Sequence, residues 1–164
     1  MAKSAAKSRN DLQDNAKTTS IAVLQACLTD SIDLYNTTRQ AHWNVKGPNF
    51  HGLHTMFETF YDTLAVDIDE LAERLVQLGG TAVGASQDVA AKTRLTPYPV
   101  EIKQGSEHVA ALADRYAALA KSVREGIDET DEAGDADTAD ILTGVSKNLD
   151  KALWMLEASA TGDR

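Results

Sequence analysis

The stretch 49-NFHGLHTMFETFYDTLAVDIDELAERLVQLGG-80 decides the fold. Its large apolar residues recur every three or four positions, which is the spacing that places side chains on one face of an α-helix. This apolar stripe consists of Leu53, Phe57, Phe60, Leu64, Ile68, Leu71, Leu75 and Leu78. Paired glycines favour a helix C-terminus, so Gly79-Gly80 ends the pattern. We therefore expect a helix from about Asn49 to Leu78 that buries one face in a larger bundle.

Three further segments show helical spacing. The first runs from candidate N-caps at Thr18 and Thr19 to about Val45, with Ile21, Leu28, Tyr35 and His42 repeating every seven residues. A third helix follows Gln104 and ends in the acidic run DETDEAGDAD, and a fourth helix follows that run. Their stripes are Val109, Leu112, Tyr116, Leu119, Val123 and Ile127, and then Ile141, Leu142, Val145, Leu149, Leu153 and Leu156.

A long crossover separates the second and third helices. It runs from Thr81 to Gln104, with a short helix expected from about Ser86 to Lys92 and a proline-containing stretch, TPYP, that cannot be regular helix. The expected fold is therefore all-α, a ferritin-like four-helix bundle with one long crossover that carries a short extra helix. We assign residues 1–17 to a flexible basic arm, 18–158 to the bundle and 159–164 to a short tail.

Composition sets limits on the function. The chain has 164 residues, a single cysteine and a formal net charge of −9. A body with this charge repels nucleic acid and attracts cations. We expect one domain, no disulfide, no membrane span and a cytoplasmic setting. The first ten residues differ, because they carry Lys3, Lys7 and Arg9 with no acid. Such an arm is either a simple solvated terminus or, repeated on one particle, a multivalent DNA contact.

The second helix carries a polar face beside its apolar stripe. At about 100° per residue, His54, Glu58, Asp69 and Glu73 fall within an arc of about 100°, away from the stripe. The residues between them, Ala65, Ala72 and Val76, are small, and the whole helix has no lysine. A solvated face usually carries pairs of lysine and glutamate. We therefore expect this face to contact another helix.

Distances along the helix require a second copy of the chain. Glu58 and Asp69 are eleven residues apart, or about 16.5 Å along the axis, so one metal ion cannot bind both. However, the pairs 54/73 and 58/69 are both centred between Thr63 and Leu64. An antiparallel copy crossing there would bring His54 to the partner's Glu73, and Glu58 to the partner's Asp69. An isologous contact of this kind creates two equivalent sites.

The ligand types are those of a transition metal. His42, at the end of the first helix, adds a second imidazole, and a mixed nitrogen and oxygen set suits Fe(II), with Zn, Mn and Co as competitors. Surface salt bridges explain the spacing equally well. The Glu-x-x-His pairs of ordinary ferritin bundles, the His-Glu-x-x-His motif and clustered cysteines are absent from the sequence.

The motifs resemble those of the Dps family, the DNA-binding proteins from starved cells. The resemblance covers about residues 18 to 158. It is carried by AHWNVKGPNF at 41–50, by His54 and Glu58, by DELAER at 69–74, by QLGG at 77–80, by TADIL at 138–142 and by LDKALW at 149–154. It implies a ferroxidase that oxidises Fe(II), preferably with hydrogen peroxide, and stores ferric mineral inside a hollow dodecamer. It also implies binding to double-stranded DNA without sequence specificity, and association with the nucleoid.

The resemblance also assigns residue roles. His42, His54 and Glu58 would come from one subunit, and Asp69 and Glu73 from its twofold partner; Glu58 stands where many relatives have Asp. Trp43 would intercept stray oxidising equivalents, although simple packing is an alternative. The acidic run, with Asp135, Asp137 and Asp140, would line a threefold pore, or else be a solvated helix start. The competing function is a DNA-condensing structural protein with a passive metal site.

Overall fold

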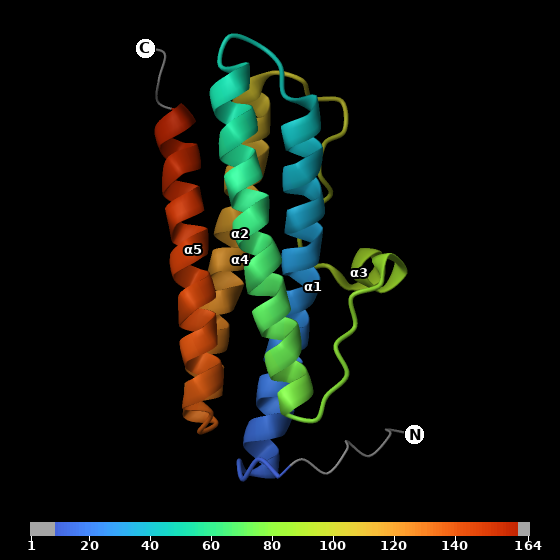
Figure 1. Ribbon diagram of the computed structural model, residues 1–164, viewed down its shortest axis with the longest axis vertical. Helices are drawn as coiled ribbons and strands as arrows, with labels where there is room; N and C mark the ends of the chain where they lie inside the picture. The colour runs from blue at the N-terminus through green and yellow to red at the C-terminus, as the bar shows by residue number, and fades with distance from the viewer. Residues whose placement is uncertain (1–8, 161–164) are drawn as a thin grey trace.

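Four long helices form an antiparallel bundle, and one short helix, third in chain order, lies outside it (Figure 1). The computed structural model describes residues 9–160. Its helices are α1 (Asp14–Asn44), α2 (Phe50–Gln77), α3 (Ser86–Lys92), α4 (Gly105–Glu132) and α5 (Ala136–Ala160). None of the helices in this range is both long and apolar enough to cross a membrane. The all-α class expected from the sequence is confirmed, because every regular element in the described range is a helix.

The apolar stripe of α2 packs in the core, as its spacing predicts. Seven of its eight residues are buried, and Ile68 is partly buried against the same cluster. Residues spaced three and four apart share one helix face, so burying this face leaves the opposite face of α2 at the surface. That second face carries the candidate metal ligands.

The N-terminus of α1 differs from the expected one. The helix begins at Asp14, four residues before Thr18, and the Thr18 hydroxyl donates to the Asp14 carbonyl oxygen inside the helix (2.8 Å). Ala16 is buried in the first turn, and Leu12 packs against the core just before it. This apolar contact extends the helix beyond the residues that best suit a cap, so residues 14–17 belong to α1 rather than to the arm.

The crossover after α2 is fastened to α1 by carboxylates. Asp30 accepts hydrogen bonds from the backbone N–H of Arg94 (2.9 Å) and from its Nε (2.8 Å). Asp33 accepts a hydrogen bond from the Thr93 hydroxyl (2.7 Å) and pairs with Arg115 of α4 (2.9 Å). The short helix α3 has the predicted bounds. These contacts hold the crossover against α1.

Candidate metal centre

The turn between α1 and α2 brings His42 and His54 together. α1 ends at Asn44, and Gly47 adopts φ 113°, a left-handed conformation that favours glycine, before α2 begins at Phe50. The chain reverses direction within these few residues, so the last turn of α1 lies beside the first turns of α2. The two imidazole rings stack with their centroids 3.6 Å apart and their planes at 20°.

Each imidazole is oriented by the backbone of the other helix. His42 Nδ1 lies 2.8 Å from the carbonyl oxygen of His54, and His54 Nδ1 lies 2.8 Å from the carbonyl oxygen of His42. A carbonyl oxygen only accepts hydrogen bonds, so both Nδ1 atoms carry the proton and donate. In the neutral ring this leaves the lone pair on Nε2. A hydrogen bond that fixes the tautomer in this way is typical of metal-binding histidines.

A carboxylate and a phenol lie next to the two imidazoles. Glu58, one turn beyond His54, is exposed, and the Tyr61 hydroxyl donates to its Oε1 over 3.5 Å. The Tyr61 ring stands edge-on to His42, with centroids 5.3 Å apart. Burial raises the pKa of the Tyr61 phenol, and the negative charges of Glu58 and Asp62 raise it further. One chain therefore supplies two imidazoles and one carboxylate at the start of α2.

The other two candidate ligands lie farther along the same face of α2. Asp69 and Glu73 are exposed, and Glu73 borders a shallow groove that also includes Ala72 and Val76. Within residues 9–160 of one chain, no three His, Cys, Asp or Glu side chains gather closely enough to hold a metal ion. Four of the five candidate ligands thus share one face of α2, and within one subunit Asp69 and Glu73 do not join His42, His54 and Glu58.

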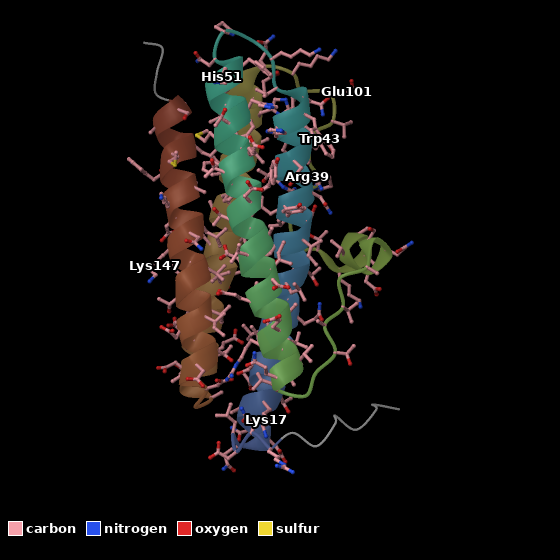
Figure 2. The ribbon with its side chains drawn as sticks, viewed as in Figure 1. Lys17, Arg39, Trp43, His51, Glu101 and Lys147 are labelled. Atoms are coloured by element: carbon pink, nitrogen blue, oxygen red, sulfur yellow. The ribbon has the colours of Figure 1, made fainter. Side chains whose placement is uncertain are left out.

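The sequence did not identify an aromatic cluster beside this site. The Arg39 guanidinium lies over the rings of Tyr35, Trp43 and Tyr61, at 5.4, 5.1 and 5.7 Å from their centroids. Figure 2 shows Arg39 and Trp43 near the end of α1 that lies toward His51. Tyr35, Arg39 and Trp43 are spaced by four residues, which places them along one face of α1. That spacing was the available signal, but only the packing of α1 on α2 adds Tyr61.

Comparison with known proteins decides the family. A family model described as a ferritin-like domain matches residues 21–162. The DNA protection during starvation protein of Agrobacterium fabrum is 49% identical over 152 residues, which cover 93% of this chain and 94% of that protein. The chain belongs to the Dps family of ferritin-like proteins.

Other Dps proteins are more distant in sequence but similar in structure. The DNA protection during starvation protein 1 of Deinococcus radiodurans is 32% identical over 93% of this chain and 74% of that protein. A tetragonal-form structure of Mycobacterium smegmatis Dps superposes with a TM-score of 0.89 at 28% identity, covering 94% of this chain and 92% of that one. DpsC from Streptomyces coelicolor, at 24% identity, shares the fold with a TM-score of 0.92 and coverage of 98% and 94%.

The acidic run of this Dps-family chain separates into buried and exposed carboxylates. Asp135 is 1% exposed, caps α5 through the backbone N–H of Thr138 (3.1 Å) and pairs with Arg74 (2.7 Å). Burial alone would raise the pKa of Asp135, but the hydrogen bonds from Thr138 and the charge of Arg74 lower it below its usual value. Asp137 and Asp140 are exposed. The carboxylate of Asp135 is therefore paired inside the subunit, and of the three candidate pore residues Asp137 and Asp140 are the exposed ones.

Two of the three basic residues of the arm lie outside the described residues. Lys3 and Lys7 are not described, whereas Arg9 is exposed just before α1. α1 separates Asp14 from His42 by 28 residues, or about 42 Å along a straight helix. Figure 2 shows Lys17 near the opposite end of the bundle from His51. The start of α1 and the His42–His54 pair thus lie at opposite ends of the subunit.

Proposed function

We propose that this chain is a ferroxidase and iron-storage subunit, with His42, His54 and Glu58 of one subunit and Asp69 and Glu73 of its twofold partner as the iron ligands. The observation that carries the proposal is the reciprocal hydrogen bonding of His42 and His54. Both backbone carbonyl oxygens accept a hydrogen bond from an Nδ1–H, and the two Nε2 lone pairs remain available to a metal. Ordinary packing of two histidines does not require this tautomer in both rings.

The geometry suits two metal ions rather than one. Dinuclear centres hold their metals about 3.5–4 Å apart, and the stacked rings are 3.6 Å apart, so each imidazole can serve one ion. Two neighbouring Fe(II) ions can each give one electron to the same molecule of hydrogen peroxide, which avoids release of hydroxyl radical. The hard carboxylate oxygens favour the Fe(III) product. Zn, Mn and Co compete for the same ligands.

The remaining ligands come from a second copy in this proposal. The exposed face of α2 has small residues, Ala65 and Ala72, with Val66 and Val76 more than half exposed, and such a surface suits a close antiparallel helix. A twofold axis near Thr63 and Leu64 then completes two centres at once. By analogy with the family, twelve subunits form a hollow shell that stores ferric mineral, and the exposed carboxylates of Asp137 and Asp140 line an iron entry pore.

Anaerobic loading tests the ferroxidase proposal. Fe(II) is added to the assembled protein without oxygen, hydrogen peroxide follows, and ferric absorbance is recorded beside the Asp69→Ala variant. We expect rapid oxidation in the wild type and a large loss in the variant. Glu70→Ala, which removes an exposed acid of the same helix outside the ligand face, is the matched control and should oxidise iron normally. Equal rates in wild type and Asp69→Ala would refute the site; no ferric absorbance in either would favour the passive metal site.

DNA binding is the second part of the proposal. Its support is the arm, with Lys3, Lys7 and Arg9 and no acid, together with the relative in Agrobacterium fabrum named for DNA protection during starvation. The body carries net charge −9, so contacts through the arms should weaken steeply with salt. Gel retardation of double-stranded DNA should disappear when residues 1–10 are deleted, and unchanged retardation would refute the arm. With both activities, the assembly would act in the cytoplasm at the nucleoid.

A further inference from the structure

One phenol stands against the candidate iron ligands. Tyr61 contacts His42 edge-on at 5.3 Å, and its hydroxyl donates to the Glu58 carboxylate over 3.5 Å. A second phenol, Tyr35, stands edge-on to Tyr61 with centroids 5.9 Å apart. The two rings form a continuous path from the ligands of α2 to the middle of α1. Neither tyrosine has a role in the ferroxidase chemistry described above.

The charge of Arg39 distinguishes these rings from Trp43. A guanidinium is permanently positive, and it lies within 6 Å of all three ring centroids. Loss of an electron leaves an indole as a radical cation, which the nearby guanidinium charge disfavours. A phenol loses its proton together with the electron and becomes a neutral radical, provided that an acceptor is in reach. Glu58 is that acceptor for Tyr61, so Tyr61 loses an electron more easily than Trp43 does.

We propose that Tyr61 supplies the second electron to hydrogen peroxide whenever the centre holds only one Fe(II). This inference rests on the proposed ferroxidase function. Iron gives one electron and becomes Fe(III), while Tyr61 gives one electron and passes its proton to Glu58. Glu58 passes this proton on to the peroxide, and a solvated proton supplies the second one. With the two electrons, these two protons cleave the O–O bond and convert one peroxide into two water molecules. No hydroxyl radical is released, and the product is a neutral radical on Tyr61.

The radical then moves to Tyr35 and is reduced by the next Fe(II). Tyr35, in contact with Tyr61, exchanges an electron and a proton with it, which moves the radical away from the ligands. The next Fe(II) to arrive gives one electron to the tyrosyl radical, which takes up one proton and becomes a phenol again. Over both steps, two Fe(II) and two protons convert one peroxide into two Fe(III) and two waters. The tyrosine thus lets the centre complete a two-electron reaction with iron ions that arrive one at a time.

Rapid freeze-quench electron paramagnetic resonance tests the proposal. The assembled protein receives one Fe(II) per centre without oxygen and then hydrogen peroxide. We expect a tyrosyl signal in the wild type that Tyr61→Phe abolishes and that Tyr98→Phe leaves in place. Tyr98 is a matched control because it lies on the crossover, where its hydroxyl contacts His108 (2.7 Å). Spin-trapped hydroxyl radical should rise in Tyr61→Phe.

Two further measurements identify the residue that carries the radical. Wild-type protein with ring-deuterated tyrosine should show a changed hyperfine pattern, which identifies the radical without any substitution. In metal-free protein, flash photo-oxidation should give a tyrosyl radical in the wild type and a tryptophanyl radical in Tyr61→Phe. A tryptophanyl signal in the wild type that Trp43→Phe abolishes would overturn the proposal.

The ferric absorbance separates this inference from the function on which it rests. Ferric absorbance without any protein radical at one Fe(II) per centre overturns the role of Tyr61 and leaves the ferroxidase proposal standing. Failure of the wild type to form ferric iron under the same conditions overturns the ferroxidase proposal itself, and the role of Tyr61 with it.

Discussion

Two inactive variants should restore each other if the metal centre is shared between subunits. His54→Ala removes an imidazole and leaves the carboxylates of α2 intact, whereas Asp69→Ala does the reverse. Metal–ligand bonds to nitrogen and oxygen are about 2 Å long, and the two positions lie fifteen residues, or about 22 Å, apart on one helix. The two residues of one chain therefore serve different centres. Each variant alone should lack both centres of its dimer.

The expected recovery follows from the twofold geometry. In a mixed dimer, the centre built from the intact His54 and the intact Asp69 is complete, and the other centre lacks both. With equal amounts and random pairing, half of the dimers are mixed, so about a quarter of all centres are restored. Co-expression of the two variants should give about a quarter of the wild-type initial rate of ferric absorbance per subunit.

A pair of variants on the same side of the centre is the control. Co-expression of His54→Ala with His42→Ala damages the imidazole set of both chains, so no pairing produces a complete centre. That mixture should stay at the level of its parents. If the mixture of His54→Ala with Asp69→Ala also stays there, although both variants assemble, the shared centre is refuted.

Three further predictions concern stability. Arg74→Ala leaves the buried Asp135 carboxylate without its cationic partner, so it should lower the free energy of unfolding in urea by about 3–5 kcal/mol. A loss below about 1 kcal/mol would contradict the pairing. Burial raises the pKa of Asp67 to about 6, so Asp67→Asn, which keeps the Asn148 contact, should stabilise the protein at pH 8 by up to about 3 kcal/mol and by little at pH 4. Burial lowers the pKa of His108, so below pH 6.5 the unfolded chain binds a proton at this residue more readily than the folded chain does. The free energy of unfolding should therefore fall on acidification below pH 6.5, and it should fall less in His108→Phe. Denaturation at several pH values would show this difference.

The sequence predicted those features that depend on neighbours within one helix. The stripe of α2 and the face with His54, Glu58, Asp69 and Glu73 follow from the helical period, because positions three and four apart share a face whatever surrounds the helix. The end of α2 followed from Gly79-Gly80, because a glycine with positive φ ends a helix locally. The N-cap of α1, expected at Thr18 or Thr19, lies at Gln13, because burial of Ala16 outweighed the capping preference of the threonines.

Contacts between helices were decided only by the tertiary structure. The mutual hydrogen bonds of His42 and His54, and therefore their tautomers, depend on how the turn at Gly47 aligns α1 with α2. The placement of Tyr61 under Arg39 likewise depends on the rotation of one helix against the other, which local spacing does not contain. In the sequence, Asp135 does not differ from its exposed neighbours in the acidic run. Its carboxylate is buried because it pairs with Arg74 of α2. Periodicity fixes which residues share a surface, and packing fixes which atoms meet across it.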